Sequence, residues 1–280
     1  MDNQKVWFIT GASKGLGLSL VKKLLSEGYR VAATSRNLGD LSKAVDNHSD
    51  QFLPLAVNIK NEESVHEAIE KTISTFGKID VLVNNAGYGL VGGLEELTDQ
   101  EARDNFEVNV FGSLNVIRKA LPYLREQQSG HILNISSIGG FTGSFPGFGI
   151  YCATKFAVNG FSESLAEEVR PFGIKVTIVQ PGYFRTSFLS EGSLVVPKHQ
   201  IDAYQNVRAS QNLHQNDLDQ QQAGDPDKAA EAMIEIVHVE NPPLNLFLGE
   251  DAYNAANNKI ASVQNDLEAW KELTTSTAIV

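Results

Sequence analysis

The chain has 280 residues, 42% of them hydrophobic, which is enough to bury one large core without requiring a second domain. Its formal net charge of −11 argues against a protein that binds nucleic acid or an anionic membrane surface. The only cysteine is Cys152, so an intramolecular disulfide is excluded and a reducing compartment is favoured. The first apolar segment starts near Lys5 and no apolar run reaches about 18 residues. We therefore expect a cytoplasmic protein with no signal peptide and no membrane span.

Short apolar runs alternate with amphipathic stretches, which is the pattern of repeated β-α units in a parallel sheet. Strands are expected at residues 6–10, 31–35, 52–57, 81–84, 131–136, 175–179 and 244–248. Helices are expected at residues 15–27, 38–47, 62–76, 99–124 with a break, 151–169 and 227–239. The predicted fold class is α/β: a single doubly wound domain over residues 1–280, with a seven-stranded parallel sheet and helices on both faces. Such a sheet binds its ligand beyond the carboxyl ends of the strands, where the strand order reverses.

Two segments depart from this alternation. Residues 188–224 are rich in Gln, Asn, Asp and Ser and lack strong periodicity, so they predict a substrate lid inserted before the last helix–strand unit. Residues 250–280 predict a C-terminal helical extension.

The first expected strand leads directly into a glycine-rich turn, Thr10-Gly11-Ala12-Ser13-Lys14-Gly15-Leu16-Gly17. Gly11 permits a tight turn, Gly15 lets the backbone approach a pyrophosphate, and Gly17 lets the following helix pack against the strand. The N–H groups at the start of that helix attract an anion. The turn therefore predicts cofactor contacts at Gly11, Ser13, Lys14, Gly15, Leu16 and Gly17. The alternative is that the glycines serve only a tight strand-to-helix connection.

The ends of the second and fourth strands bear on the choice of cofactor. The second ends in Thr34-Ser35-Arg36, where a carboxylate favours NAD and an arginine accommodates the 2′-phosphate of NADP. Arg36 and Lys14 could both reach that phosphate, so NADP(H) is favoured over NAD(H), unless both are solvated surface cations. The fourth strand continues into Asn85, Ala86 and Gly87, which could border the adenine side or form a plain turn.

Tyr151 and Lys155 lie four residues apart at the start of an expected helix, so their side chains share one face. A free phenol has a pKa near 10, and a nearby ammonium favours the phenolate and lowers that pKa. The spacing is a weak motif by itself, but this is the only such pair in the chain. Ser137, after the fifth expected strand, could hold a carbonyl oxygen beside the tyrosine, with Ser136 as the rival.

In their order and spacing these segments resemble the short-chain dehydrogenase/reductase family, over residues from about 5 to 250. The resemblance rests on residues 10–17, residues 84–87, Asn109 within Val108-Asn109-Val110, Ser137, Tyr151 with Lys155, and Pro181-Gly182 followed by Thr186. It implies a Rossmann-like oxidoreductase in which Tyr151 is the general acid–base and Ser137 positions the substrate oxygen. Lys155 would bind the nicotinamide ribose and lower the tyrosine pKa, and Asn109 would support a proton relay through water.

The resemblance also implies further cofactor contacts. Pro181 and Gly182 would border the nicotinamide ring, and Thr186 would contact its carboxamide. Asn58, where many members carry an aspartate, would lie against the adenine, with Ile59 as a neighbouring contact. The chain looks most like the branch with retinol and 17β-hydroxysteroid dehydrogenases, and residues 241–252 look like bacterial members of uncharacterised substrate. Ser137 and Tyr151 are 14 residues apart, one more than the commonest spacing of the family.

Six aromatic residues suggest an apolar substrate site, although each could equally belong to the core: Phe141, Phe145, Phe148, Tyr183, Phe184 and Phe188. The function predicted is an NADP(H)-dependent carbonyl reductase or alcohol dehydrogenase acting on a small-molecule ketone or aldehyde and the matching alcohol. One alternative is a catalytically silent NADP-sensing protein, which the loss of Tyr151, Lys155 or Ser137 would mark. Epimerase or dehydratase chemistry is a third possibility, for which the chain is short.

The remaining expectations concern metals, the cysteine and assembly. The six histidines show no ligand spacing, so no metal site is expected. Cys152 lies about 100° around the helix from Tyr151 and is expected to be a packing residue. The resemblance implies a homodimer or homotetramer, built on helices near residues 104–126 and 151–169.

Overall fold

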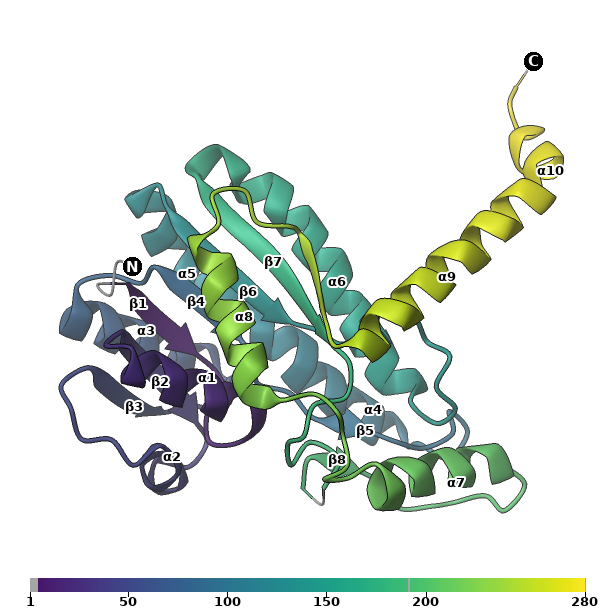
Figure 1. Cartoon of the computed structure of the whole chain (residues 1–280), viewed down its shortest axis with the longest axis horizontal. Coiled ribbons are helices and arrows are strands. Elements are labelled where there is room, and N and C mark those ends of the chain that lie inside the picture. The colour runs from purple at the N-terminus through teal and green to yellow at the C-terminus, as the bar shows by residue number, and fades with distance from the viewer. Residues whose placement is uncertain (1–4, 191, 280) are drawn as a thin grey trace.

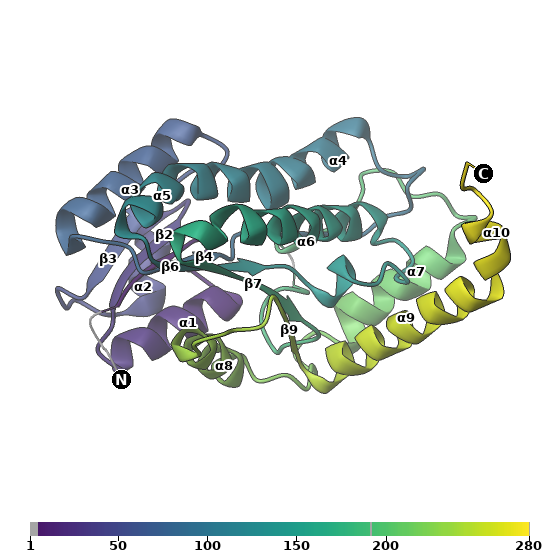
Figure 2. The same cartoon turned by 90° about the horizontal axis from the view of Figure 1, so that it is seen from above.

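The computed structural model describes residues 5–190 and 192–279, and its centre is a seven-stranded sheet between two layers of helices (Figures 1 and 2). The strands are β1 (Val6–Ile9), β2 (Arg30–Ser35), β3 (Phe52–Ala56), β4 (Val81–Asn84), β6 (Gly130–Ile135), β7 (Ile174–Pro181) and β9 (Asn245–Leu248). Their order is β3-β2-β1-β4-β6-β7-β9, and every neighbouring pair is parallel. The predicted α/β class with its doubly wound, seven-stranded parallel sheet is confirmed. Residues 1–4, 191 and 280, which the predicted domain, lid and extension include, lie outside the described residues.

The helices divide between the two faces of the sheet (Figure 2). The main helices are α1 (Gly15–Ser26), α2 (Leu38–Val45), α3 (Glu62–Phe76), α4 (Asp99–Phe106), α5 (Ser113–Gln127), α6 (Gly149–Val169) and α8 (Pro226–His238). Buried side chains of α1, α2 and α8 form one apolar core against the sheet, and those of α3, α5 and α6 form the other. Because both faces are covered, β1 and residues 81–83 of β4 form unbroken buried apolar runs rather than alternating patterns.

Local signals explain where individual helices begin and end. The Asn61 side chain accepts the Ser64 N–H at 2.9 Å, which caps the start of α3, and Gly77 ends that helix with a left-handed φ of 83°. Before α4, Thr98 and Glu101 form a reciprocal capping box. These contacts account for the close match between predicted and observed bounds in this part of the chain.

The helix expected over residues 99–124 is interrupted, as predicted, and the interruption has a specific form. Between α4 and α5, η1 (Glu107–Gly112) is a π-helical segment that contains Asn109. Such wide turns occur mostly as single interruptions of α-helices, and frequently at functional sites. The sequence predicts the break but not its π-helical geometry.

The lid segment, defined here as residues 188–224, joins the body through a small sheet that the sequence does not predict. Within it lie β8 (Leu194–Val195), α7 (Gln205–Asn212) and the π-helical η4 (Leu213–Asp217). β8 pairs in parallel with β5 (Gly89–Leu90), which follows β4. The lid segment is therefore hydrogen-bonded to the body of the protein at the carboxyl ends of the sheet strands, through β5.

The chain closes with α9 (Glu250–Ala269) and α10 (Lys271–Thr275), which project away from the sheet (Figure 1). Ala252 and Ala256 are the buried residues of α9 and pack near Ile138 of the short turn η2 (Ile138–Gly140). In the described part of the chain, no helix has both the length and the apolar character needed to cross a membrane.

Candidate active site

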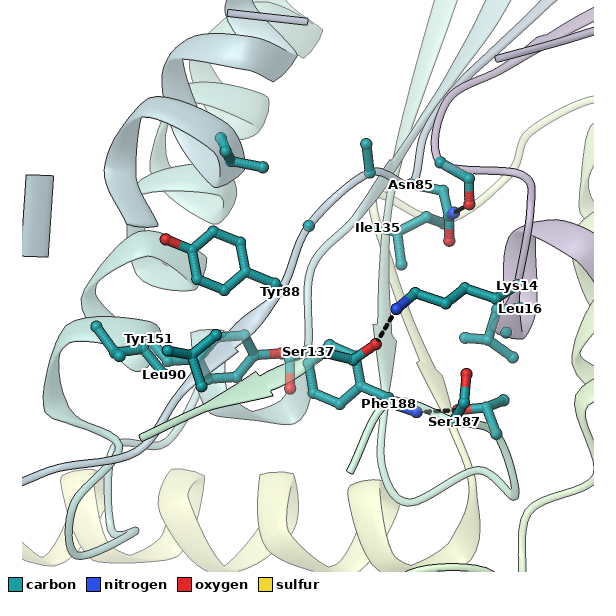
Figure 3. Close-up of a pocket in the computed structure, with 18 of the residues that line it drawn as sticks. Lys14, Leu16, Asn85, Tyr88, Leu90, Ile135, Ser137, Tyr151, Ser187 and Phe188 are labelled. Atoms are coloured by element: carbon teal, nitrogen blue, oxygen red, sulfur yellow. Dashed lines mark hydrogen bonds between the residues drawn. The ribbon is translucent and has the colours of Figure 1, made fainter. Parts of the chain in front are cut away.

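A pocket of about 860 Å³ opens at the carboxyl ends of the parallel strands, where β1 lies between β2 and β4 and the strand order reverses. Its volume is within the range of about 300–1,000 Å³ that is usual for ligand pockets. The predicted site residues that line it are Gly11, Ser13, Lys14, Gly15, Leu16, Arg36, Asn58, Ile59, Asn85, Ala86, Gly87, Ser137, Tyr151, Lys155, Pro181, Gly182 and Thr186. In Figure 3, Tyr151 and Ser137 lie on one side of the pocket and Lys14 on the other. Gly17 and Asn109 are not among the lining residues.

Each glycine of the turn after β1 has its own geometric cause. Gly11 has a φ of 66°, and a Cβ there would lie 2.7 Å from the Cα of Ala86. Gly15 has a φ of 60° and exposes its backbone to the pocket beside Thr186. A Cβ at Gly17 would lie 2.4 Å from the Asn85 side-chain nitrogen. The predicted packing role of Gly17 is therefore seen in the structure, whereas its predicted contact with the cofactor is corrected, because Gly17 does not line the pocket.

Asn85 stabilises the glycine turn directly. Its side-chain amide donates to the carbonyl oxygens of Thr10 and Gly11, both at 2.9 Å. The Thr10 hydroxyl in turn accepts the N–H groups of Asn85 and Ala86, both at 3.0 Å. These four hydrogen bonds fix the ends of β1 and β4 to each other and hold the backbone of the glycine turn in one conformation. A turn of this kind before a helix can bind a phosphate through its backbone N–H groups.

The end of the pocket beside β2 carries two cations. Burial, followed by repulsion from the nearby Arg36, lowers the pKa of Lys14. The Lys14 ammonium donates to the Ser193 hydroxyl and, at 3.5 Å, to the Gly192 carbonyl. Among the residues that the structure describes, no salt bridge joins either cation to a carboxylate. Asp40, in the first turn of α2, also lines this end, and the sequence analysis does not identify it.

Tyr151 and Lys155 are both buried on α6 and face the pocket. The Lys155 ammonium donates to the Ile135 carbonyl at 2.9 Å and lies 5.8 Å from the centre of the Tyr151 ring. Burial lowers the pKa of Lys155 to about 8. Burial also raises the pKa of Tyr151, and its hydrogen bond with the Ser137 side chain acts in the opposite direction. Contrary to the expected lowering by the lysine, the Tyr151 phenol is thus held in its protonated form.

The two candidate serines have different partners. Ser136 is buried and its hydroxyl donates to the Lys155 carbonyl at 3.2 Å, which fixes α6 to the end of β6. Ser137 caps η2 by accepting the Gly139 N–H at 3.0 Å, and its side chain interacts with the Tyr151 phenol. The geometry therefore selects Ser137 over Ser136 as the serine beside the tyrosine.

Asn109 lies behind the site rather than in it. Its side-chain nitrogen donates to the Tyr88 carbonyl and to the Thr154 hydroxyl, both at 3.0 Å, and its oxygen accepts the Tyr88 N–H at 3.0 Å. A Cβ on Gly87 would lie 3.1 Å from the Asn109 side-chain oxygen. Asn109 thereby connects η1, α6 and the chain after β4, and both N–H groups of its side-chain amide are used by protein partners.

The segment after β7 brings an unpredicted acid to the site. Pro181 ends β7, and the Gly182 N–H donates to the Leu248 carbonyl at 2.9 Å. A Cβ on Gly182 would lie 2.2 Å from the Asp251 carboxylate, which accepts the Tyr183 N–H at 2.7 Å. The only sequence signal for this contact is the position of Asp251 in the first turn of α9.

Aromatic and aliphatic side chains form the part of the pocket near Tyr151. The apolar lining residues there include Leu90, Phe145, Phe148, Tyr183, Phe184, Phe188 and Leu189. Phe141 instead packs edge-on against Phe247, with 5.2 Å between ring centres, below α9. Cys152, expected to be a packing residue, is buried but also lines the pocket, and burial raises its pKa to about 11. Such a thiol stays protonated and unreactive.

His214 of the lid segment is a buried pocket residue that the sequence analysis does not identify as a site residue. Its Nδ1 lies 2.7 Å from the Ser210 carbonyl and its Nε2 lies 2.8 Å from the Tyr183 hydroxyl. A carbonyl only accepts, so we assign the ring proton to Nδ1, and the Tyr183 hydroxyl then donates to Nε2. Burial lowers the pKa of His214, which favours this neutral form.

A second buried contact fixes the middle of the lid segment. The Glu96 carboxylate accepts the N–H groups of Gly93 at 2.6 Å and Ile201 at 2.8 Å, and it also pairs with Arg208 of α7.

Among the described residues, no group of three or more His, Cys, Asp or Glu side chains could hold a metal ion.

Comparisons with known proteins show the family of this chain. Residues 5–193 match the family model described as short chain dehydrogenase. An oxidoreductase, BOA17, from Botryotinia fuckeliana is 35% identical over 98% of this chain and 99% of its own length. A 3-ketodihydrosphingosine reductase from Bacteroides thetaiotaomicron is 38% identical over 88% of each chain. Human 17-beta-hydroxysteroid dehydrogenase type 1 is 32% identical over 88% of this chain and 77% of its own length.

Solved structures give the same result for the fold. A short-chain dehydrogenase from Streptomyces avermitilis superposes with a TM-score of 0.90 and 38% identity over 98% of each chain. A 3-ketoacyl-(acyl-carrier-protein) reductase from Brucella melitensis complexed with NADH gives a TM-score of 0.73 and 28% identity, covering 87% of this chain and 96% of its own. ElxO with NADP bound gives a TM-score of 0.71 and 27% identity, covering 87% of this chain and 96% of its own. Nicotinamide complexes of both kinds are thus found on this fold, and the chain belongs to the short-chain dehydrogenase family of oxidoreductases.

Proposed function

We propose that the protein is an NADP(H)-dependent oxidoreductase that interconverts a ketone or aldehyde with the corresponding alcohol. The observation that carries the proposal is the group of half-buried Ser137 with buried Tyr151 and Lys155, which faces one pocket together with the glycine turn. A nicotinamide bound there would supply the hydride, and the protein would supply orientation and the proton. The turn fits a dinucleotide because Gly15, the first residue of α1, lines the pocket without a side chain, so that the start of the helix can approach a pyrophosphate.

The three side chains have distinct parts in the proton chemistry. In the direction of reduction, Tyr151 donates its phenolic proton to the oxygen of the substrate carbonyl, and Ser137 donates a hydrogen bond to the same oxygen. The raised pKa of Tyr151 keeps the phenol protonated until then. The ammonium of Lys155, 5.8 Å from the ring centre, stabilises the phenolate that remains. In oxidation each proton moves in the opposite direction. Asn109 is a positioning residue in this scheme, because its amide holds the backbone of Tyr88.

The preference for NADP(H) over NAD(H) is supported by Lys14 and Arg36. Both line the pocket beside the end of β2, and neither is neutralised by a carboxylate in a salt bridge within the described residues. A 2′-phosphate carries about −1.5 to −2 charge and is stabilised by two such cations. The Asp40 carboxylate opposes this preference, and its exposed position at the start of α2 weakens that effect.

An apolar substrate is supported by the lining of the pocket around Tyr151. Phe148 and Phe188 lie with their ring centres 6.3 Å and 5.9 Å from that of Tyr151. The names of two relatives, a 3-ketodihydrosphingosine reductase and a 17-beta-hydroxysteroid dehydrogenase, describe apolar ketones or alcohols. We propose that residues 188–224 act as the substrate lid of a single domain, since they supply Phe188, Leu189 and His214 to the pocket.

Assembly and location are proposed on separate observations. Phe111 of η1 and Phe156 of α6 are large apolar side chains that are 48% and 44% exposed. They support a homodimer or homotetramer formed through these helices. The single free Cys152 supports a reducing, cytoplasmic location.

The test is NADPH-dependent turnover of a panel of apolar ketones, followed by the absorbance of the nicotinamide. Tyr151→Phe is expected to lower kcat by a factor of about 10²–10⁴ while the affinity for NADPH is retained. Tyr123→Phe, on α5 and outside the pocket, is the matched control. A Tyr151→Phe enzyme with the wild-type rate would disprove the catalytic assignment. Binding of NADPH without turnover of any ketone or alcohol would favour the NADP-sensing alternative.

A further inference from the structure

Helix α9 leaves the body of the protein after its first two turns. Ala252 and Ala256 are buried, whereas every described residue from 257 to 279 is exposed. The helix has 20 residues and a length of about 30 Å. Figure 1 shows it projecting from the end of the sheet, with no other element along its outer part. A helix of this length without packing partners is marginal by itself, because most helical stability comes from the burial of an apolar face.

The apolar side chains of α9 follow a heptad repeat. They are Tyr253, Ala256, Ile260, Val263, Leu267 and the capping residue Trp270. The intervals are three, four, three, four and three residues, which defines the a and d positions of a coiled-coil seam. All except Ala256 are between 41% and 63% exposed. Five of the six positions are therefore exposed and have no packing partner in the described part of the monomer, whereas Ala256 packs against the body.

We propose that the partner is α9 of a second copy, packed antiparallel. A two-fold axis between Ala261 and Ser262 places Ile260 against Val263 of the second copy, twice. The same axis places Tyr253 against Trp270 of the second copy at each end. Large side chains therefore meet in four of the six layers, and Leu267 faces Ala256 of the second copy in the other two. The interface is self-complementary, as a two-fold axis requires. The two protein bodies lie at opposite ends of the helix pair.

The charges beside the seam favour this orientation. Lys259 and Asp266 occupy the two g positions, and in an antiparallel pair g faces g. Lys259 then lies beside Asp266 of the second copy, and the same pair forms again across the axis. In a parallel pair Lys259 would instead face Gln264, and the partner of Asp266 would be Lys271, which lies beyond the end of α9 in α10. Neither residue has a salt-bridge partner among the described residues of its own chain.

The composition of α9 argues against a lipid surface as the partner. The helix carries four carboxylates, Glu250, Asp251, Asp266 and Glu268, and one cation, Lys259. Helices that lie on anionic membranes are rich in Lys and Arg on their polar face, which α9 is not. The seam buries on the order of 1,000 Å² in total, which is at the lower limit for a specific interface. Pairing through α9 is thus expected to depend on concentration, and it is independent of the surface around Phe111 and Phe156.

The first experiment measures the mass of the full-length protein by light scattering and sedimentation equilibrium. Leu267→Glu places a charge in the seam and is expected to halve the assembly mass. Ala261→Glu, on the same exposed helix but outside the seam, is the matched control and should keep the wild-type mass. Circular dichroism confirms that both variants fold. Equal assembly masses for the wild type and Leu267→Glu would overturn the proposal. It would also be overturned if the wild type bound anionic vesicles, Leu267→Glu did not, and the assembly mass of the two proteins were the same.

The second experiment tests the orientation by exchanging charges. Lys259→Asp and Asp266→Lys each create two like-charge pairs in the antiparallel arrangement, so each is expected to lower the assembly mass at low salt. The double variant restores two attractive pairs and should recover the wild-type mass. Wild-type assembly in the single variant Lys259→Asp would overturn the antiparallel register, because only a parallel pair leaves that position facing Gln264.

Discussion

Replacement of Arg36 by alanine is expected to weaken the binding of NADPH and to leave the binding of NADH unchanged. Arg36 follows the last residue of β2 and lies near Lys14, whose pKa it lowers. Both cations line the pocket at the end where the adenosine ribose of a dinucleotide binds. NADPH and NADH differ only in the 2′-phosphate at that ribose, so a residue that binds this group acts on one cofactor alone.

The expected loss of NADPH affinity is about tenfold. A hydrogen bond to a charged group contributes about 1.5–3 kcal/mol. The Arg36 side chain is exposed, so solvent and salt screen the interaction and the lower end of that range applies. About 1.4 kcal/mol corresponds to a factor of ten in the dissociation constant. Lys14 is still present in the variant and continues to attract the phosphate, which also limits the loss.

Fluorescence titration with NADPH and NADH measures the effect, at low and at high ionic strength. Arg30→Ala is the matched control, because Arg30 is exposed on the same strand but at its opposite end. Asp40→Asn is expected to change NADPH affinity in the other direction by removing a negative charge from the same end of the pocket. The reasoning is refuted by an equal loss for the two cofactors, by no loss for either, or by a loss of the same size in Arg30→Ala.

Three further predictions concern the turn, pH and the lid segment. Gly17→Ala puts a Cβ 2.4 Å from the Asn85 side-chain amide and should impair folding and nucleotide binding. In the control Gly160→Ala the new Cβ meets no atom within 4 Å, and the free energy of unfolding should rise by up to about 1 kcal/mol. Thermal unfolding of the two variants measures the difference. Burial lowers the pKa of His131 to about 4 from about 6.5 in the unfolded chain. Between pH 6.5 and pH 4 the unfolded state therefore binds more protons than the folded state. The free energy of unfolding should fall by up to about 3 kcal/mol as the pH is lowered from 6.5 to 4. Urea unfolding at several pH values measures this fall, and the His131→Asn variant should lack the part of the pH dependence that comes from His131. Tyr183→Phe removes the hydrogen-bond donor to His214 Nε2 and should lower kcat/KM about tenfold while the affinity for NADPH stays unchanged. The double variant Tyr183→Phe/His214→Phe leaves no unpaired ring nitrogen, so its kcat/KM should recover.

Much of the fold could be predicted because its signals are local. The strands are short apolar runs, and caps such as Asn61 and Gly77 end helices within a few residues of the apolar pattern. The glycine turn and the Tyr151–Lys155 pair are also local, since each lies within one turn of chain or helix. Even so, the contact of Gly17 with Asn85, which follows another strand, has no local signal, and the sequence analysis therefore expects Gly17 to contact the cofactor as well as to pack.

The features that the sequence analysis missed depend on contacts between distant segments. β5 and β8 are only two residues long, so neither has a pattern, and their pairing exists because the lid segment returns to the sheet. Asp251 reaches Tyr183 across 68 residues. Phe141 has the composition of a pocket residue, but packing against Phe247 places it in the core below α9. Hydrophobicity alone does not distinguish these two environments.

The same distinction explains why the reaction class is easier to infer than the substrate. The groups that handle the proton are fixed by elements of the sheet: Lys155 donates to the end of β6, and Ser136 holds the carbonyl of Lys155. The apolar part of the pocket is instead shaped by the lid segment, which is held by single long-range contacts such as Glu96 with Ile201 and Tyr183 with His214. Substitutions at such contacts reshape the pocket without touching the reacting atoms. Relatives with the same chemistry can therefore be named for substrates as different as a sphingoid ketone and a steroid alcohol.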